Sequence, residues 1–357
     1  SGALASGIFD WCEEKTLGFS EFITLGNKAD INENDVLQYF LDKKQGGPVG
    51  LYLESINNGP ELLRLCREIA KKDPVYILKP GKNEAAKKAM QSHTGAIAGE
   101  DFVLEAVLQQ KGIIRCQTMQ EFFDLTQAFT WGNIPAGPRL AIISNAGGPA
   151  VLAADAAVNA GLEVSQLVDV LGDALAEKYP QAIEEIFAAD KADSVLAILT
   201  PQIMTEVEKT AQSIAEISRK YSQPIFPSFI GGAKISAGEK IFNEQKVPNF
   251  PYPERAVFCL SAMWQYKKHL QTADAAELVP WTTNIDFSIA KTIFSKAREK
   301  TLDPFEINKL LTSIGLSAPA TLKISTFEEA RSFVRDWGYP LVLKIASAQL
   351  LHKTDID

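Results

Sequence analysis

Short runs of apolar residues alternate with longer amphipathic stretches along almost the whole chain, and this alternation limits the possible folds more than any other feature. The runs at residues 49–54 and 75–79 are continuously apolar, as expected for strands that helices cover on both faces. Such alternation is typical of α/β proteins with parallel sheets. The strands predicted in this first block are residues 22–25, 49–54, 75–79 and 113–116, and the helices are residues 4–14, 34–42, 60–71, 102–111 and 119–130.

A break rich in Gly and Pro at residues 131–138 separates this block from a second one, and we predict a domain boundary there. The second block repeats the alternation, so it predicts a second parallel α/β domain. Its predicted strands are residues 139–144, 195–199 and 224–229, and its predicted helices are residues 149–160, 174–189, 206–220, 234–243 and 254–269.

The pattern loosens from residue 272 to 301, where an ordered linker is predicted rather than a sheet. A third unit follows, and it is expected to be incomplete because it is too short to close a core before residue 357. Its predicted elements are helices 304–314 and 326–337 and strands 320–324 and 341–345. The predicted organisation is a domain at 1–133, a domain at 134–273, a linker at 274–303 and the start of a further domain at 304–357.

Composition excludes several classes of protein. The formal net charge of −8, from 36 basic and 44 acidic residues, disfavours nucleic acid as the main partner, because its phosphates require clustered Lys and Arg. No apolar run is long enough to span a membrane, and no signal peptide is recognisable. The cysteines (Cys12, Cys66, Cys116 and Cys259) are scattered without a CxxC pair, so we expect buried free thiols, no metal site and a cytoplasmic protein.

One of the three histidines, His93, lies in a loop of small residues just before a predicted helix start. Small residues let backbone N–H groups approach a ligand closely, and a helix start adds unpaired donors and a positive dipole end. This setting suits an imidazole that carries a phosphoryl group. A polar loop histidine without chemistry is the alternative interpretation.

Two other loops place Ser, Gly or Asn at a helix start. Ser1-Gly2-Ala3 precedes the first helix, and residues 144–149 (Ser-Asn-Ala-Gly-Gly-Pro) join a strand to a helix. In open α/β folds such strand-to-helix loops lie at the carboxyl edge of the sheet, where ligands bind. Both loops are candidate phosphate sites that could converge on His93, although either could be a plain helix cap.

A phosphorylated histidine needs a partner that holds its unreactive ring nitrogen, and a carboxylate serves this purpose. Glu54 ends an apolar strand and is the candidate, with a solvated loop carboxylate as the alternative. In the third unit, Lys344 ends a predicted strand and suits a nucleotide phosphate, although a surface lysine is the simpler interpretation. His269 is predicted to be structural or exposed.

Together these loops resemble the NDP-forming acyl-CoA synthetase family, which includes ADP-forming acetyl-CoA synthetase and is related to succinyl-CoA synthetase. The matching stretches occur in family order and are residues 1–3 (SGA), 25–30 (LGNKAD), 52–54 (YLE), 92–95 (SHTG), 144–149 (SNAGGP), 168–174 (VDVLGDA), 199–202 (LTPQ) and 352–355 (HKTD). The resemblance implies an α/β fold with two flavodoxin-like, succinyl-CoA synthetase-type domains of three layers and mainly parallel sheets. The start of an ATP-grasp domain follows them.

The resemblance also implies roles for single residues. His93 would be the phosphorylated histidine, Glu54 its partner, His352 a second histidine that relays the phosphoryl group, and Lys344 a nucleotide contact. The implied phosphate-binding residues are Ser1, Gly2, Ser92, Thr94, Gly95, Asn145, Ala146, Gly147 and Gly148. The implied cofactors are Mg²⁺ and ATP/ADP or GTP/GDP, with CoA as a substrate and no protein metal ligand. The partners are small molecules, and self-association into a homo-oligomer stays open.

The chain departs from the family pattern in three places. The CoA-binding domain expected before Ser1 is absent, and the ATP-grasp domain breaks off after residue 357. Residues 161–167 also run almost directly into the 168–174 motif, where relatives carry a longer stretch. Either this loop is shortened or residues are missing from the sequence, so helix and strand boundaries near Gln166 are unsafe.

The function implied is a reversible acyl-CoA synthetase that forms a carboxylic acid, NTP and CoA from acyl-CoA, NDP and phosphate, through an acyl phosphate and a phosphohistidine. One alternative is a composite protein lysine acetyltransferase with a ligase-like core, and the intact residues 92–95 weigh against it. The other is a non-catalytic module that senses CoA or nucleotide, which would have no use for a His93–Glu54 pair.

Overall fold

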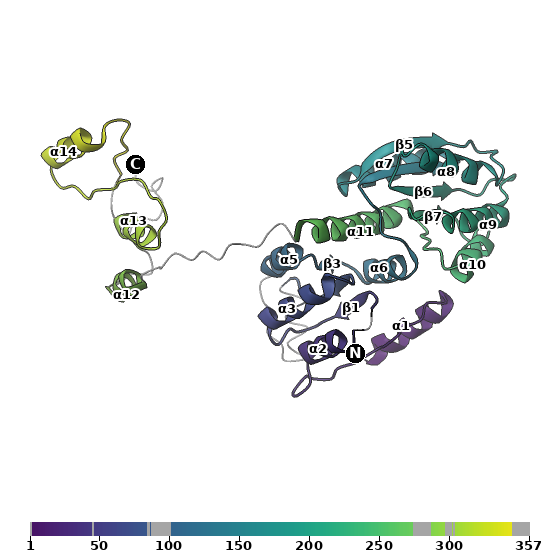
Figure 1. The fold of residues 1–357 in the computed structure, drawn as a ribbon, viewed down its shortest axis with the longest axis horizontal. Coiled ribbons are helices and arrows are strands. Elements are labelled where there is room, and N and C mark those ends of the chain that lie inside the picture. The colour runs from purple at the N-terminus through teal and green to yellow at the C-terminus, as the bar shows by residue number, and fades with distance from the viewer. Residues whose placement is uncertain are drawn as a thin grey trace. The chain divides into compact units, whose positions relative to one another are not determined.

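The structure is a computed structural model that describes residues 2–44, 46–83, 86, 101–273, 287–296, 302 and 304–344. The chain divides into two compact units, Ser1–Ala276 and Glu277–Asp357 (Figure 1). The first unit contains two parallel sheets with helices packed against them. Each unit is described by itself below.

The first sheet consists of three parallel strands in the order β1-β2-β3. These are β1 (Val49–Tyr52), β2 (Val75–Leu78) and β3 (Ile114–Cys116), and all residues of β2 are buried. The helices are α1 (Gly2–Glu14), α2 (Glu33–Lys43), α3 (Gly59–Ala70), α5 (Asp101–Gln110) and α6 (Met119–Trp131). Side chains of Asn32, Asn58 and Thr118 cap the first turns of α2, α3 and α6, which fixes where these helices begin.

The second sheet has four parallel strands in the order β5-β4-β6-β7. They are β4 (Arg139–Ser144), β5 (Glu163–Asp169), β6 (Ser194–Leu199) and β7 (Ile225–Phe229). The helices are α7 (Gly147–Asn159), α8 (Lys178–Ala188), α9 (Val207–Ser218), α10 (Ser236–Glu244) and α11 (Pro253–Ala273). Strand β4 lies between β5 and β6, which is the order 2-1-3-4 of a flavodoxin-like sheet.

One apolar core joins the two sheets. It includes Leu78 of β2, Leu140 of β4 and Tyr266 of α11, all buried in a single cluster. Helix α11 packs against both α6 and α7 (Figure 1). A buried Asp124 on α6 accepts two hydrogen bonds from the Arg255 guanidinium on α11, which ties the helices together where the two sheets meet.

Most predicted elements of the first unit are confirmed within a few residues, but the predicted strand at 22–25 is wrong. The segment is extended and forms no ladder with any described residue, and its Ile23 is 45% exposed. An apolar run becomes a strand only where a neighbouring backbone satisfies its N–H and C=O groups, and this one has no such neighbour.

Strand β5 was not predicted, because the shortened stretch after Gly161 obscures its pattern. It pairs with β4 through a register shift, in which Leu140 faces Val164 and Ala141 faces Gln166, so that Ser165 bulges out. The bulge leaves Leu167 48% exposed on an edge strand. The 168–174 motif begins within the last two residues of β5. The longer connection that the family pattern predicts before this motif is replaced by the strand itself.

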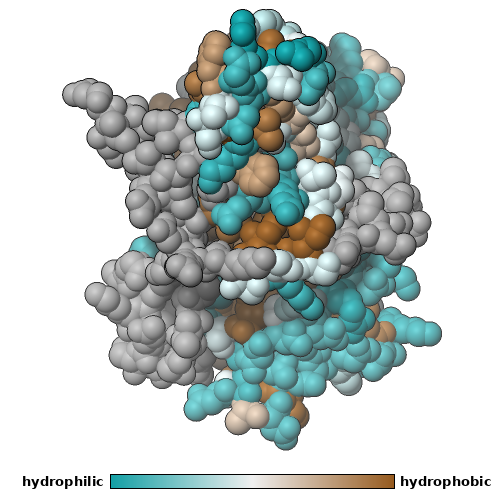
Figure 2. Space-filling view, turned by 90° about the vertical axis from the view of Figure 1, so that its left-hand side faces the viewer, coloured by the Kyte–Doolittle hydropathy of each residue, from teal (hydrophilic) through white to brown (hydrophobic). Residues whose placement is uncertain are grey.

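The second unit contains α12 (Phe287–Lys296), α13 (Pro304–Ser313) and α14 (Phe327–Trp337). The sequence predicted α13 and α14, and α12 is a helix within the stretch 274–303 for which an ordered linker was predicted. Residues 320–324 form no strand, and neither do residues 341–344, the described part of the strand predicted at 341–345, where Leu343 is 82% exposed. Neither α13 nor α14 has a buried residue, as expected for a unit too short to close a core. Apolar side chains also reach the surface among hydrophilic ones on the face in Figure 2.

Candidate phosphate-binding edges

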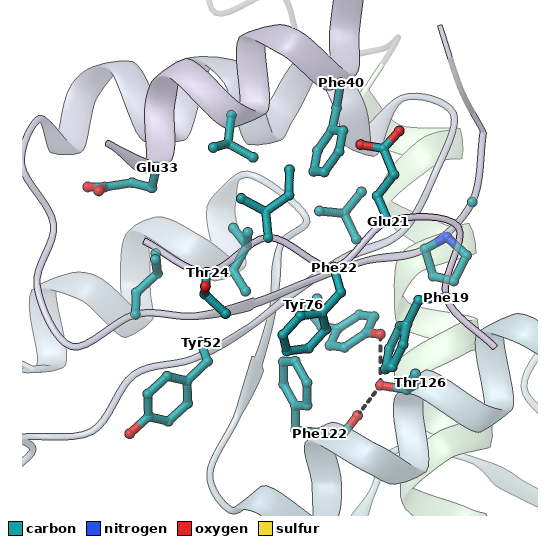
Figure 3. A pocket seen from close by; sticks show the side chains of 18 of the residues that line it. Phe19, Glu21, Phe22, Thr24, Glu33, Phe40, Tyr52, Tyr76, Phe122 and Thr126 are labelled. Carbon is teal, nitrogen blue, oxygen red and sulfur yellow. Dashed lines mark hydrogen bonds between the residues drawn. The ribbon is translucent and has the colours of Figure 1, made fainter. Parts of the chain in front are cut away.

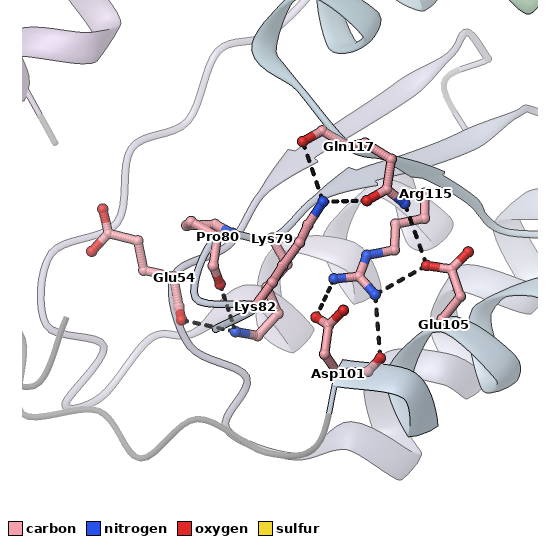
Figure 4. A network of polar contacts seen from close by, with 8 residues as sticks. All are labelled: Glu54, Lys79, Pro80, Lys82, Asp101, Glu105, Arg115 and Gln117. Atoms are coloured by element: carbon pink, nitrogen blue, oxygen red, sulfur yellow. Dashed lines mark hydrogen bonds and ion pairs between the residues drawn. The ribbon is translucent and has the colours of Figure 1, made fainter. Parts of the chain in front are cut away.

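The first candidate site is the carboxyl edge of the first sheet, where residues that follow parallel strands meet. Glu54 follows β1, Lys79 follows β2 and Gln117 follows β3. The Lys79 ammonium donates to the backbone oxygens of Glu54 and Pro80, each at 3.3 Å (Figure 4). Burial and the nearby Arg115 charge lower the pKa of Lys79. The Glu54 carboxylate is turned away from this ammonium in Figure 4, and burial together with the Glu54 carboxylate raises the pKa of Tyr52.

Arg115 on β3 is a buried cation that lies beside this edge. Its role was not predicted from the sequence. Its guanidinium is paired with the carboxylates of Asp101 and, at 3.0 Å, Glu105 (Figure 4). An arginine inside the apolar run 113–116 was the signal, because a charge is buried in a strand only when it has partners. Lys82 adds a further cation near this edge and donates to Gln117. The charge of Arg115 is balanced by its two carboxylate partners, whereas the Lys79 and Lys82 ammonium groups donate to uncharged oxygens.

The loop that carries Glu54 is held in place by a second ion pair. Lys28 lies 2.9 Å from the buried Glu33 carboxylate and donates to the Ser55 carbonyl at 2.6 Å. The backbone N–H of Asn57 donates to the same Glu33 carboxylate at 2.7 Å. These bonds fix the chain directly after Glu54. Lys28 belongs to the family-matching stretch 25–30, and it braces the site.

Several predicted site residues lie outside the described residues, so their placement stays a prediction: Ser1, Ser92, His93, Thr94, Gly95 and His352. Gly2 is the first residue of α1. Lys344 is exposed and follows no strand. The described residues thus bring Glu54 together with Lys79 and Arg115, which are cations of the same sheet edge.

The second candidate site is the loop between β4 and α7 at the carboxyl edge of the second sheet. Its Asn145 is buried and its side chain holds the chain after β6: the amide donates to the Thr200 carbonyl at 2.9 Å, and the carboxamide oxygen accepts from the Thr200 amide at 2.8 Å. The Asn145 side chain therefore braces the loop through its contacts with Thr200. The role of Thr200 was not predicted.

The start of α7 is open. Within the described part of the chain, no side chain caps it: the N-cap residue is Ala146, whose own amide donates to the Ser144 hydroxyl at 3.1 Å. The next residues, Gly147 and Gly148, are exposed, and a Cβ at either position would meet nothing within 4 Å. The first amides of a helix have no partner within the helix and lie at its positive dipole end. This geometry suits a phosphate, as predicted for both glycines.

Comparison with known proteins decides the family. Residues 1–129 match the family model of the succinyl-CoA ligase like flavodoxin domain, and residues 294–357 match that of an ATP-grasp domain. A 4-hydroxybutyrate–CoA ligase (ADP-forming) of Nitrosopumilus maritimus is 32% identical over 99% of this chain and 54% of its own length. The chain belongs to the NDP-forming acyl-CoA synthetase family. An acetate–CoA ligase (ADP-forming) of Methanocaldococcus jannaschii is likewise 32% identical over 99% of the chain and 54% of its own length.

A solved structure of this synthetase family has the same fold. The dinucleotide-forming acetyl-coenzyme A synthetase 1 of Candidatus Korarchaeum cryptofilum, in complex with phosphate and ADP, superposes with a TM-score of 0.72 at 25% identity. The match covers 78% of this chain and 66% of that one. The chain spans about half the length of the curated relatives named above. The predicted α/β fold with parallel sheets, a flavodoxin-like domain and the start of an ATP-grasp domain is confirmed.

The structure also describes the cysteines of this chain and its possible metal ligands. All four cysteines are free and buried, as predicted, and burial raises the pKa of the Cys12 thiol to about 11. Among the described residues, no group of three or more His, Cys, Asp or Glu side chains could hold a metal ion. None of the helices described in either unit has both the length and the apolar character needed to cross a membrane.

Proposed function

We propose that the protein is an acid–thiol ligase that interconverts acyl-CoA, NDP and phosphate with a carboxylic acid, NTP and CoA. The names of the relatives support this proposal, since they are ADP-forming CoA ligases for different acids. Those names cover more than one acid, so the proposal specifies a carboxylic acid as a class. It assigns the phosphohistidine loop to a domain at 1–133, a second CoA-ligase domain to 134–273, a linker to 274–303 and the nucleotide site to the region from 304 onward.

The observation that carries the proposal is the open start of α7. Two exposed glycine amides lie there at the carboxyl edge of a parallel sheet, with no side-chain cap among the described residues. Such a helix start binds a phosphoryl group through its N–H groups. The edge of the first sheet supplies a second candidate surface for an anion beside Glu54, through the Lys79 ammonium.

The reaction proceeds in balanced steps. A phosphate oxygen attacks the thioester carbonyl, the C–S bond breaks, and CoA leaves as the thiol while acyl phosphate remains. A ring nitrogen of His93 then attacks phosphorus, and the carboxylate leaves with the electrons of the P–O bond. Finally a ring nitrogen of His352 takes the phosphoryl group from His93, and a terminal oxygen of NDP attacks phosphorus there, which yields NTP and two neutral histidines. Phosphoryl transfer of this kind depends on positioning and electrostatic stabilisation.

The candidate site residues have separate roles in this reaction. The Glu54 carboxylate accepts the N–H of the unreactive ring nitrogen and stabilises the cationic phosphorylated ring. The amides of Gly2 and Ala146–Gly148 hold phosphoryl oxygens, together with Ser1, Ser92, Thr94 and Gly95. Asn145 positions the second of these helix starts. His352 relays the phosphoryl group, and Lys344 contacts the nucleotide.

The proposed cofactors follow from the family. ADP or GDP and their triphosphates would bind at the ATP-grasp domain, with CoA as substrate; the Korarchaeum relative was solved with phosphate and ADP. Mg²⁺ would neutralise charge on the nucleotide phosphates, and no described residue is assigned to it. The free buried thiols support a reducing compartment, and we propose the cytoplasm. A Pyrococcus furiosus relative is named as a subunit alpha, which supports assembly with further chains.

The alternative functions have no support in the relatives described above. Those relatives are named as CoA ligases or synthetases, and none of them is named as an acetyltransferase or a sensor. The ligase is therefore the single proposal.

The test is phosphoenzyme formation by the full-length protein. We expect incubation with γ-labelled ATP and Mg²⁺ to give an acid-labile label that maps to a peptide containing His93, and His93→Ala to abolish it without loss of folding. Glu54→Gln should slow labelling, because a neutral amide stabilises the cationic ring less. A label of equal extent in the His93→Ala protein would contradict the assignment.

A further inference from the structure

We propose that Lys28 is a positioning residue for the phosphoryl transfer. Its ammonium group, paired with Glu33, fixes the turn that follows Glu54 and thereby holds the Glu54 carboxylate in one orientation. Lys28 acts through Glu54 and not on the reacting atoms. The inference rests on the proposed function, in which Glu54 stabilises the phosphorylated ring.

Three hydrogen bonds from Lys28 and Glu33 hold the turn that follows Glu54. The Lys28 ammonium donates to the Ser55 carbonyl at 2.6 Å. The backbone N–H of Asn57 donates to the Glu33 carboxylate at 2.7 Å, and the Asn57 side-chain amide donates to the Lys28 carbonyl at 3.4 Å. The lysine therefore binds this turn through its ammonium group and through its backbone.

The two ends of the turn have supports of their own. At its start, the Glu54 carbonyl accepts a hydrogen bond from the Lys79 ammonium at 3.3 Å (Figure 4). At its end, the Asn58 carbonyl accepts from the Asn34 side chain at 3.4 Å, and the Asn58 side chain caps α3. Lys28 thus holds the middle of a turn that is tied at both ends. Its loss should shift the turn rather than unfold it.

The ion pair between Lys28 and Glu33 is shielded from water. The Lys28 side chain is 11% exposed and the Glu33 side chain 2%, with 2.9 Å between the ammonium nitrogen and a carboxylate oxygen. Glu33 is the first residue of α2, where the positive end of the helix dipole favours a carboxylate. In Figure 3 this carboxylate points away from the aromatic side chains of Phe22 and Phe40. A buried charge is costly without a partner, so the pair keeps the ammonium in place.

The backbone of Lys28 lies in the left-handed region, with φ at 56°. This conformation suits glycine, and it costs free energy in a residue that has a Cβ. A glycine here would fit the backbone but would supply no ammonium group. Strained residues persist where the surrounding structure holds them, and they cluster at functional sites. The strain at this position therefore supports a role for the Lys28 side chain.

The two lysines hold Glu54 without neutralising its carboxylate. Lys79 donates to the Glu54 carbonyl, and the charge of Lys28 is balanced by Glu33. A carboxylate that stabilises a cationic ring has to keep its charge and has to be oriented before the reaction begins. Contacts to the backbone meet both requirements.

A double-mutant cycle in the full-length protein tests the inference. We expect Lys28→Met to slow labelling by γ-labelled ATP about tenfold or more, because a misplaced group loses much of its effect on the rate. In the Glu54→Gln background, which lacks the carboxylate, Lys28→Met should slow labelling no further. Lys44→Met is the matched control and should label at the rate of the parent, since Lys44 has the same left-handed backbone, with φ at 54°, but is exposed.

The outcomes separate the role of Lys28 from that of Glu54. Labelling at the parent rate in Lys28→Met, or an equal slowing in both backgrounds, would overturn the positioning role and leave the proposed role of Glu54 intact. Labelling of Glu54→Gln at the parent rate would instead overturn the proposed role of Glu54, and the positioning role with it.

A second variant removes the brace without leaving a buried charge unpaired. Lys28→Met alone deprives the Glu33 carboxylate of its cation, so its urea midpoint should fall. Combining it with Glu33→Gln removes both charges, and the new carboxamide oxygen can still accept from the Asn57 N–H. We expect the combined variant to have a higher midpoint than Lys28→Met but to label as slowly, because the Ser55 carbonyl still lacks its donor. Recovery of the labelling rate together with the midpoint would show that Lys28 serves stability alone.

Discussion

The side chain of Asn145 and the backbone of Thr200 hold each other through two hydrogen bonds, one from the amide at 2.9 Å and one to the carboxamide oxygen at 2.8 Å. They join the loop after β4 to the loop after β6 at the carboxyl edge of the second sheet. The open start of α7 follows two residues after Asn145. The position of the glycine amides is thus set by a residue that we do not expect to touch the ligand.

Replacing Asn145 by Ala should destabilise the fold and weaken phosphate binding together. The substitution leaves the half-buried Thr200 amide and carbonyl without their Asn145 partners, which costs about 1 kcal/mol. We expect a lower free energy of unfolding in urea and a higher KM for phosphate. Asn159→Ala, at the exposed far end of α7, is the control and should change neither quantity. A normal KM for phosphate in Asn145→Ala would show that the brace does not position the site.

Gly148→Asp should separate helix stability from anion binding. A carboxylate in the first turn is favourable for the helix by about 0.3–1 kcal/mol, so the free energy of unfolding should be unchanged or slightly higher. The same charge repels phosphate, and we expect the KM for phosphate to rise. Gly148→Ala is the matched control, because a Cβ there meets nothing within 4 Å. If the Asp and Ala variants bind phosphate equally well, the start of α7 is not the anion site.

Asp124→Asn should destabilise the first unit strongly. Asp124 is 3% exposed and is the carboxylate that Arg255 binds with two nitrogens. Removing one partner of a buried pair costs about 3 kcal/mol, reduced here by the partial exposure of Arg255. Asp155→Asn, an exposed carboxylate on α7, should leave the urea midpoint unchanged. Equal midpoints for the two variants would mean that the pair contributes nothing to stability.

His269 should make the protein less stable in acid. Burial, together with the charges of Arg67 and Lys111, lowers the pKa of His269 below its usual value. Between the folded and the unfolded pKa the unfolded chain binds more protons, so stability falls as the pH drops through this window. We expect His269→Gln to lose less stability than the parent between about pH 7.5 and about pH 5.5, as measured by urea unfolding. An identical loss in both proteins would contradict the predicted coupling.

The sequence predicts a strand well where burial alone defines it. Strand β2 is buried at every residue, and a continuous apolar run marks it. Residues 22–25 are also largely apolar but form no ladder with the described residues, and β5 carries a bulge at Ser165 and exposes Leu167. Pairing and register depend on distant segments, so local pattern cannot supply them.

For the candidate site, the positions of the loops could be predicted from the sequence, but the side-chain contacts could not. Loop sequences located Glu54 and the glycines of α7, because a glycine-rich turn between a strand and a helix is a local feature. The bracing contacts of Asn145 with Thr200 and of Lys28 with Glu33 depend on side-chain orientation. Arg115 was missed because its carboxylate partners follow from the packing of α5 against β3.

The core that α11 shares with both sheets limits which segments of the chain can be exchanged by recombination. A recombination event that separated residues 139–229 from 49–116 would strip α11 of one of its two packing partners and expose the cluster around Tyr266. We therefore expect the segments that form the two sheets to be exchanged together rather than separately.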